Sequence, residues 1–263
     1  MKNMKYFLPF LTLLIIGFSG CSSEDTMMEE EEEATGNLDV LFWADEFDGN
    51  GPINSNVWNF ETGGGGWGNQ EVQIYSNSTK NVVKENGILK IKVFKEPNGT
   101  YSSARITTQD KIDFKYGRVD IRAKLPTVAG TWPALWMLGD NFSTVGWPHC
   151  GEIDIMEQFT DKTTVDATCH WNNGGSTASY GLSTKVENSG TEFHVYSLIW
   201  EEGSIKALVD DKQYYVMSTN DSMPFDANFF FIFNVAMGGT NGGTIASDFT
   251  TDVMEVDYVR VYQ

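Results

Sequence analysis

The stretch GEIDIME, residues 151–157, has the composition of a β-strand but carries three acidic residues in its last six positions. Glu152 and Asp154 are two residues apart, so on a strand both side chains point to the same face of the sheet. Strict alternation would place Met156 on that face next and send Glu157 to the opposite side. The clustering of these carboxyl groups needs an explanation, because burying an unpaired charge costs several kcal/mol.

The composition of the whole chain favours an all-β protein. With 263 residues, it can form one large domain with a full core or at most two small ones. The 26 glycines and 13% aromatic residues are typical of short strands joined by turns. A formal net charge of −18 argues against a nucleic-acid partner, which needs clustered Lys and Arg, whereas a neutral polysaccharide does not.

Short strand patterns separated by turn residues follow one another from Val40 to the end of the chain. Residues 88–94 and 117–125 alternate, residues 193–217 form three strands, and residues 253–263 form a last strand. Residues 229–237 are almost all apolar, as in a strand that is buried on both faces. Only residues 219–227 resemble a short helix or a loop. This pattern predicts an antiparallel two-sheet sandwich or barrel within one domain, residues 38–263.

The N-terminus reads as an export signal followed by a tether. Lys2 and Lys5 precede an apolar stretch that ends in FSGC at Cys21, too short to span a membrane. The ending resembles a bacterial lipobox, which predicts a signal peptide over residues 1–20 and a lipid on Cys21; an ordinary secretion signal is the alternative. Residues 21–37 are acidic and poor in core residues, so we expect a flexible tether. This acidic run also resembles the surface-export signal of Bacteroidetes-type lipoproteins, although a plain spacer is the alternative.

These features predict an exported protein at the outer membrane or cell surface, with a periplasm-facing location left open. Its membrane contact would be through the lipid anchor alone, and we expect a monomer. Cys150 and Cys169 could form a disulfide in an exported protein. Because Cys150 shares the face of Glu152 and Cys169 lies opposite to His170, we instead expect two reduced, half-buried thiols.

The glycine-rich stretch TGGGGWGNQE, residues 62–71, is not a phosphate-binding loop. It lacks the Gly-Lys-Ser/Thr ending, and no helix pattern follows it. We expect a mobile loop that presents Trp67 and Asn69 near a cleft.

Three explanations of the acidic strand remain open on the residues alone. A salt-bridge lattice suits it poorly, because no Lys or Arg lies between Trp132 and Lys162. A carboxylate metal site is the second explanation, although divalent cations usually recruit loops that wrap the ion. The third explanation is glycoside hydrolysis, which needs one ionised and one protonated carboxyl group on either side of the anomeric carbon.

For glycoside hydrolysis, the outer pair Glu152 and Glu157 must face the same way. A β-bulge between Asp154 and Glu157 achieves this, because one extra residue returns Glu157 to the face of Glu152. Asp154 would then lie between the two glutamates, raise the pKa of a neighbour and orient both by hydrogen bonds.

The sequence resembles glycoside hydrolase family 16 from about residue 38 to residue 263. GEIDIME matches the E-x-D-x-x-E signature of its laminarinase-like members, whereas the lichenase branch has one residue fewer. Further matches, in order, are WADEF (43–47), GGGGWGNQEVQIY (63–75), SARITT (103–108), YGRVDIRAKLP (116–126), GTWPALWML (130–138), FNVAMGG (233–239) and DYVRVY (257–262). The resemblance implies a β-jelly-roll sandwich of two antiparallel sheets, a substrate cleft on the concave sheet, and retention of anomeric configuration.

The same resemblance implies roles for individual residues. It makes Glu152 the nucleophile, Glu157 the acid/base and Asp154 the helper. No cofactor is implied for catalysis, but a structural Ca²⁺ site is implied at Glu46, the backbone of Gly87, and Asp257. The residues implied to contact substrate are Trp132, Trp136, Asn69, Arg105, His170 and Asn234, with Trp67 and Trp171 as weaker candidates.

Two segments depart from the family pattern. Laminarinases commonly read GGNWPG after the FNVAMGG-type strand, whereas this chain reads GGTNGG at residues 238–243. CHWNNGG, residues 169–175, also replaces the usual small residues after the histidine. We therefore expect an endo-β-1,3-glucanase, with activity on mixed β-1,3/1,4-glucan left open. A family 16 hydrolase of a galactan such as agarose and a non-catalytic glycan-binding lipoprotein are the alternatives.

Overall fold

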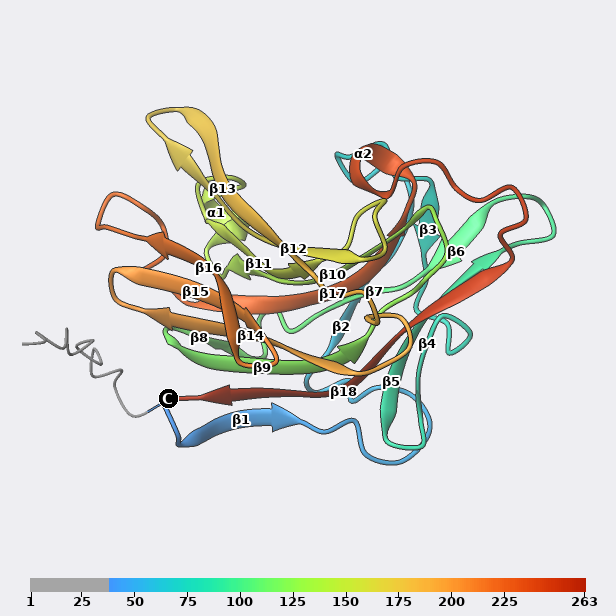
Figure 1. Cartoon of the computed structure of the whole chain (residues 1–263), viewed down its shortest axis with the longest axis horizontal. Coiled ribbons are helices and arrows are strands. Elements are labelled where there is room, and N and C mark those ends of the chain that lie inside the picture. Colours follow the sequence, from blue (N-terminus) through green and yellow to red (C-terminus); the bar gives the residue numbers. More distant parts are fainter. Residues whose placement is uncertain (1–37) are drawn as a thin grey trace, which may run out of the picture. The chain divides into compact units, whose positions relative to one another are not determined.

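The computed structural model describes residues 38–263 (Figure 1). The predicted signal peptide, Cys21 and the acidic tether lie outside the described residues. No helix among the described residues is long and apolar enough to cross a membrane.

Two β-sheets make up the fold and carry nearly all of its regular structure. The first sheet has ten strands, in the order β16-β15-β14-β9-β18-β5-β6-β3, with β1 on β18 and β4 on β5. Its strands are β1 (Leu41–Asp45), β3 (Gln73–Tyr75), β4 (Val82–Glu85), β5 (Ile88–Lys95), β6 (Tyr101–Ser103), β9 (Gly117–Lys124), β14 (His194–Glu201), β15 (Ser204–Val209), β16 (Lys212–Ser218) and β18 (Thr251–Tyr262). All its pairings are antiparallel except the parallel pair β3 and β6.

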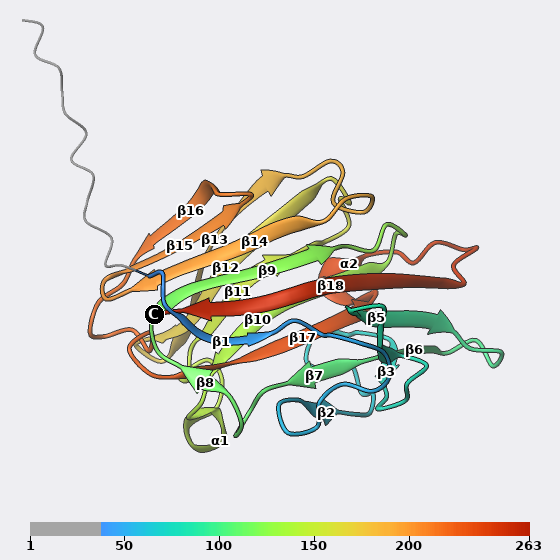
Figure 2. The ribbon, with the colours of Figure 1, turned by 90° about the horizontal axis from the view of Figure 1, so that it is seen from below.

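The second sheet has eight strands, in the order β13-β12-β11-β10-β17-β7-β2, with β8 on β17. Its strands are β2 (Asn59–Glu61), β7 (Arg105–Thr107), β8 (Asp113–Phe114), β10 (Thr131–Gly139), β11 (Glu152–Glu157), β12 (Thr164–Asn173), β13 (Ser176–Lys185) and β17 (Phe229–Met237). Figures 1 and 2 show the two sheets stacked in a jelly-roll sandwich, with β9, β14 and β18 beneath β10, β11 and β17.

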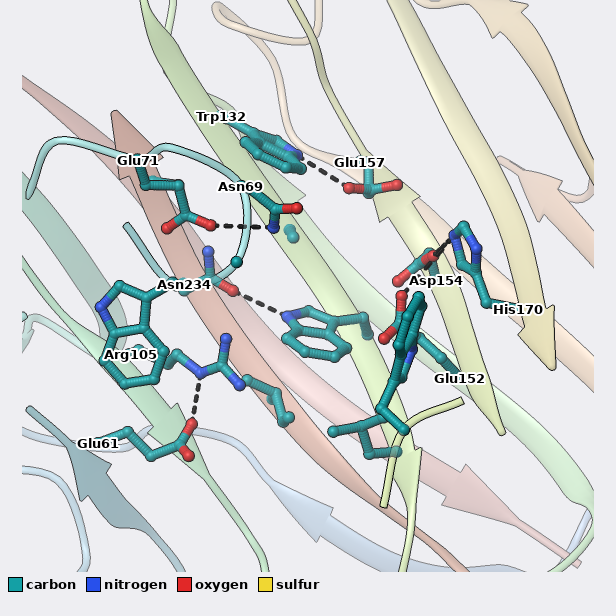
Figure 3. A pocket seen from close by; sticks show the side chains of 18 of the residues that line it. Glu61, Asn69, Glu71, Arg105, Trp132, Glu152, Asp154, Glu157, His170 and Asn234 are labelled. Carbon is teal, nitrogen blue, oxygen red and sulfur yellow. Dashed lines mark hydrogen bonds and ion pairs between the residues drawn. The ribbon is translucent and has the colours of Figure 1, made fainter. Parts of the chain in front are cut away.

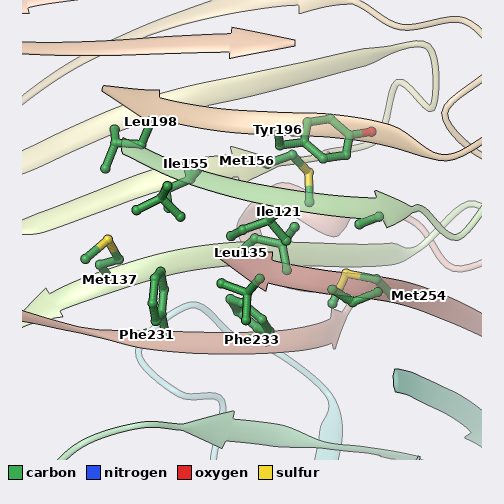
Figure 4. Close-up of a cluster of buried hydrophobic side chains, with 14 of the residues drawn as sticks. Ile121, Leu135, Met137, Ile155, Met156, Tyr196, Leu198, Phe231, Phe233 and Met254 are labelled. Carbon is green, nitrogen blue, oxygen red and sulfur yellow. The ribbon is translucent and has the colours of Figure 1, made fainter. Parts of the chain in front are cut away.

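The hydrophobic core lies between the two sheets (Figure 4). Ile121 of β9 and Leu198 of β14 contribute from one sheet, and Leu135 of β10 and Phe233 of β17 from the other. Strand β9 alternates strictly between buried and half-buried residues, as its sequence predicts, so its charged residues point away from the core.

Strand β17 is buried along its whole length, which confirms its prediction as a strand covered on both faces. Phe231 and Phe233 belong to the core, whereas Ile232 and Asn234 line a cavity on the opposite face of the sheet. The apolar run therefore contains one polar residue, Asn234, because that position faces the cavity.

Local details extend or correct the sequence-based expectations. Residues 219–227 form a loop, which is one of the two expected alternatives, and two single-turn helices appear elsewhere among the described residues, α1 (Phe142–Val145) and α2 (Gly239–Gly242). Cys150 and Cys169 are both free, as predicted, but both are fully buried rather than half-buried. Cys169 lies in the core between the sheets and Cys150 lies in a separate apolar cluster with Phe230, so the two thiols lie on opposite faces.

Candidate active site

A cavity of about 750 Å³ lies on the face of the eight-stranded sheet that points away from the core (Figure 3). It contains seven of the eight sequence-predicted substrate-contacting residues and all three acidic residues of β11. The lining residues that carry the argument are Glu61, Trp67, Asn69, Glu71, Arg105, Trp132, Trp136, Phe142, Trp147, Glu152, Asp154, Glu157, His170, Asn234 and Asn241.

Strand β11 contains the predicted bulge. Asp154 pairs with Trp136 and Met156 pairs with Leu135 of β10, so Ile155 has no partner on that strand. The pairing with β12 shifts register over the same segment. Ile155 and Met156 are both buried in the core, and Glu157 returns to the cavity beside Glu152 and Asp154. The extra residue therefore places all three carboxyl groups on one face, as predicted.

The entry to β11 depends on a glycine. Gly151 has a φ of 80°, in the left-handed region that non-glycine residues rarely adopt. A Cβ at this position would also lie 2.9 Å from Cζ of Phe229. The chain therefore enters the acidic strand packed closely against Phe229, and position 151 has no room for a side chain.

Burial raises the pKa of each carboxyl group on this face. The pKa of Glu152 rises to about 8, mainly by burial and then by the charge of Asp154. Burial also raises the pKa of Asp154 to about 8, and burial together with the charge of Asp154 raises the pKa of Glu157 well above its usual value. Three such groups cannot all ionise together, so the site retains a proton near neutral pH.

The surroundings distinguish the two glutamates. His170, Arg105 and the Trp147 side chain oppose the rise in the pKa of Glu152, so they favour its ionised form. Glu157 is more deeply buried and faces two other carboxyl groups, and its main compensating contact is a 2.8 Å hydrogen bond from Nε1 of Trp132. Of the two glutamates, Glu152 is therefore the more readily ionised, and Glu157 keeps its proton more strongly.

A hydrogen-bond chain ties the second tryptophan to the wall of the cavity. Nε1 of Trp136 donates to Oδ1 of Asn234 at 2.8 Å, and Nδ2 of Asn234 donates to the Tyr75 hydroxyl at 3.1 Å. The Tyr75 hydroxyl in turn donates to Oε2 of Glu71 at 3.3 Å. Asn234 therefore fixes the orientation of the Trp136 ring at the cavity.

Arg105 lies between two indole rings at the other side of the cavity. Its guanidinium carbon is 4.9 Å from the ring centroid of Trp67 and 4.8 Å from that of Trp136. Nε of Arg105 also donates a hydrogen bond to Glu61 of the adjacent strand β2. Stacking and ion pairing together hold the planar guanidinium in one position.

Glu71 was not singled out from the sequence, yet it organises the glycine-rich loop. Its carboxylate is buried and accepts hydrogen bonds from Asn69 at 3.2 Å, Gln73 at 2.5 Å and Tyr75 at 3.3 Å. It therefore fixes Asn69 at the cavity rim. The sequence offered one signal for Glu71. It belongs to the alternating residues at the end of the glycine-rich motif.

The segment GGTNGG, which departs from the family pattern, forms α2 at the cavity rim. The backbone nitrogen of Thr240 donates to the carbonyl of Asn69 at 2.9 Å, and Oγ1 of Thr160 donates to the carbonyl of Asn241 at 3.2 Å. Asn241 lines the cavity. This segment therefore links the Asn69 loop to the loop that follows the acidic strand.

Trp171 is the one predicted substrate-contacting residue that the structure does not bring into the cavity. It follows His170 on β12 and so points to the opposite face, where its ring packs against Phe225 at a centroid distance of 6.2 Å. Two aromatic residues that the sequence did not single out take part instead. Trp147 and Phe142 line the cavity, and the Trp147 ring lies 6.2 Å from that of His170.

The residues expected to bind calcium do not form a free donor set. Both carboxylate oxygens of Glu46 accept hydrogen bonds from Arg260 at 2.8 Å, and Asp257 accepts one from Arg122 at 2.5 Å. Both carboxylates are paired with arginine in this arrangement, and a cation would have to displace those arginines. The calcium site stays a prediction, and no catalytic step below depends on it.

Comparison with known proteins gives a consistent result. Residues 68–260 match the model of the glycosyl hydrolases family 16. A beta-glucanase of Rhodothermus marinus is 37% identical over 100% of this chain and 96% of its own length. Glucan endo-1,3-beta-glucosidase A1 of Niallia circulans is 40% identical over 85% of this chain, which spans 38% of that protein.

A solved structure also matches over most of both chains. LamA from Z. galactanivorans in complex with laminaritriose and laminaritetraose superposes with a TM-score of 0.80 and 38% identity, covering 86% of this chain and 99% of that one. Residues 68–260, which match the family model, contain the bulged acidic strand and every predicted cavity-lining residue except Trp67. The chain therefore belongs to glycoside hydrolase family 16.

Proposed function

We propose that the protein is a retaining endo-glycoside hydrolase that cleaves β-1,3-glucan, with mixed β-1,3/1,4-glucan as a second substrate. The observation that carries this proposal is the bulge in β11, which gathers Glu152, Asp154 and Glu157 at one cavity. Indole rings beside these carboxyl groups suit the apolar faces of pyranose rings. The two relatives described above are named as a glucan endo-1,3-beta-glucosidase and a beta-glucanase.

In the first step, the ionised carboxylate of Glu152 attacks the anomeric carbon, and a covalent glycosyl–enzyme bond forms. Glu157 gives its proton to the glycosidic oxygen as the bond to the leaving sugar breaks. The high pKa of Glu157, which burial and Asp154 produce, supplies that proton near neutral pH.

In the second step, Glu157 takes a proton from water, and the water oxygen attacks the anomeric carbon from the opposite side to Glu152. The bond to Glu152 breaks, Glu152 is ionised again, and two inversions give net retention. Asp154, between the two glutamates, adjusts their pKa values as the proton moves.

The charge of the cavity favours a neutral polymer. Glu61, Glu71 and the three acidic residues of β11 line it, and Arg105 is the only Lys or Arg among its lining residues. Arg105 is itself paired with Glu61. Such a surface disfavours sulfated polysaccharides, because their charges would meet uncompensated carboxylates.

A substrate screen tests the proposal. Purified protein is incubated with laminarin, lichenan, agarose and κ-carrageenan, with Glu152→Gln as the control, and the oligosaccharides released are identified by mass spectrometry. We expect short products from laminarin first, from lichenan second, and none from carrageenan. Products from agarose without any from laminarin would assign the enzyme to galactans instead.

The same screen addresses a non-catalytic glycan-binding protein. In that case laminarin in the gel would retard the wild type and Glu152→Gln equally on affinity electrophoresis, and neither protein would release products. We expect the wild type to degrade laminarin and Glu152→Gln to bind it without turnover.

We also propose export of the protein and its attachment to the membrane by a lipid on Cys21, which the lipobox-like ending FSGC supports. Mass spectrometry of the protein isolated from its natural membrane tests this. A diacylglyceryl modification at an N-terminal Cys21 is the expected result, and a mature chain without lipid would contradict it.

A further inference from the structure

Glu152, Asp154 and His170 bring three potential metal ligands together at the cavity floor (Figure 3). One atom from each side chain lies within 4.8 Å of the other two. Glu152 pairs directly with His170 across β11 and β12, so the backbone register itself sets this proximity. Nε2 of His170 lies 3.4 Å from Oδ2 of Asp154 and 3.7 Å from Oε1 of Glu152.

Oδ2 of Asp154 is a separate observation that points to a ligand. The side chain is only 5% exposed, and among the described residues this oxygen has no hydrogen-bond partner. Buried polar atoms without a partner are rare and costly. Oδ2 is the same carboxylate oxygen that lies 3.4 Å from Nε2 of His170, so it belongs to the cluster.

The separations of His170 from the two carboxylates suit a small tetrahedral cation. Zinc binds histidine nitrogen and carboxylate oxygen at about 2.0–2.2 Å, so neighbouring ligands on a tetrahedron are separated by roughly 3.3–3.6 Å. The two His170 separations, 3.4 and 3.7 Å, are within about 0.1 Å of that range. Two carboxylates and one imidazole also suit zinc or copper better than calcium or magnesium, which prefer oxygen ligands alone.

We propose that Glu152, Asp154 and His170 form an inhibitory site for a divalent transition-metal ion, with Zn²⁺ as the representative. The three side chains supply three ligands, and the fourth position faces the cavity, where water completes the tetrahedron. The bound ion is coordinated by the carboxylate of Glu152 and lies where the reacting sugar would bind. Binding of metal and of polysaccharide is therefore mutually exclusive.

The test uses direct metal binding, which does not require the protein to hydrolyse any particular glycan. Chelator-treated protein is titrated with ZnCl₂ by isothermal calorimetry. The chain contains three histidines, His149, His170 and His194, so each can be replaced in turn. His149 is exposed and does not line the cavity, so His149→Gln is the matched control.

We expect one zinc site in the wild type and in His149→Gln, and at least a tenfold weaker site in His170→Gln. A thermal melt establishes that His170→Gln is folded. No zinc binding by the wild type at millimolar concentration, or equal affinity in folded His170→Gln, would overturn the site.

Competition is measured on the same calorimeter with Glu157→Gln, which keeps all three ligands but should not turn over substrate. Saturating laminarihexaose should weaken zinc binding at least tenfold, and an unchanged zinc affinity with bound oligosaccharide would refute mutual exclusion. If laminarihexaose does not bind at all, the glucan assignment fails, while the zinc titration of the wild type still decides the metal site.

Discussion

Nε1 of Trp132 donates a 2.8 Å hydrogen bond to Oε1 of Glu157, so one residue both lines the cavity and contacts the proposed acid/base. This bond favours the ionised form of Glu157 and lowers its pKa against the larger effects of burial and Asp154. The bond gives Glu157 a more moderate pKa than burial alone would produce, which suits a group that must both donate and accept a proton.

Replacing Trp132 by Phe keeps an aromatic ring but removes this donor. The pKa of Glu157 should then rise further, and the alkaline limb of the pH profile of kcat/KM should move upward by about one pH unit, since a hydrogen bond to a charged group contributes about 1.5–3 kcal/mol. Trp136→Phe is the control, because its indole bonds to Asn234 and not to a carboxyl group. An unchanged or lowered alkaline limb in Trp132→Phe would contradict the role given to this bond.

Replacing Glu152 by Gln should stabilise the fold in a pH-dependent way. The folded-state pKa of Glu152 is raised from 4.5 to about 8, so the folded protein binds more protons than the unfolded chain between these values. Stability therefore falls as pH rises from about 4.5 to about 8. Gln mimics the protonated acid at every pH and avoids this loss.

The measurement is the melting temperature of wild type and Glu152→Gln at pH 4.5 and at pH 8. We expect nearly equal values at pH 4.5 and a gain of at least about 1 kcal/mol, roughly 2–4 °C, for the variant at pH 8. Glu187→Gln, at an exposed glutamate remote from the cavity, serves as the control. A stabilisation that is the same at both pH values would show that burial of the charge is not its cause.

Replacing Arg105 by Lys should weaken substrate binding more than it slows chemistry. Lysine keeps the charge but cannot stack a planar group between Trp67 and Trp136 while bonded to Glu61. We expect KM for laminarin to rise roughly tenfold, equivalent to about 1.4 kcal/mol, with a smaller change in kcat. Arg118→Lys, on the opposite sheet, should leave both constants unchanged. A fall in kcat at constant KM would instead place Arg105 in the chemical step.

The fold and the acidic strand were predictable because their signals are local. Alternation in β9, the apolar run of β17 and the spacing of Glu152, Asp154 and Glu157 are each contained in fewer than ten residues. The bulge followed from a single requirement, that Glu157 share the face of Glu152. The structure meets it by burying two successive residues, Ile155 and Met156.

The rest of the cavity depends on contacts between distant segments. Glu61 meets Arg105 because β2 pairs with β7, and Asn234 meets Tyr75 across 159 residues. No local pattern encodes such pairings. The placement of Trp171 was wrong for a different reason: its parity relative to His170 already pointed away from the cleft. Family resemblance implied Glu46 and Asp257 as calcium ligands. It gave no sign of their hydrogen bonds to Arg260 and Arg122, because strand pairing brings those residues together.

The division of labour between Glu152 and Glu157 is the central claim, and azide rescue tests it most directly. Glu152→Ala and Glu157→Ala are each given 2,4-dinitrophenyl β-laminaribioside with sodium azide, and the anomeric configuration of the glycosyl azide is determined by proton NMR. Azide that replaces the missing nucleophile should give the α-azide from Glu152→Ala. Azide that attacks the intact glycosyl–enzyme should give the β-azide from Glu157→Ala. The opposite pair of configurations would exchange the two roles and contradict the account.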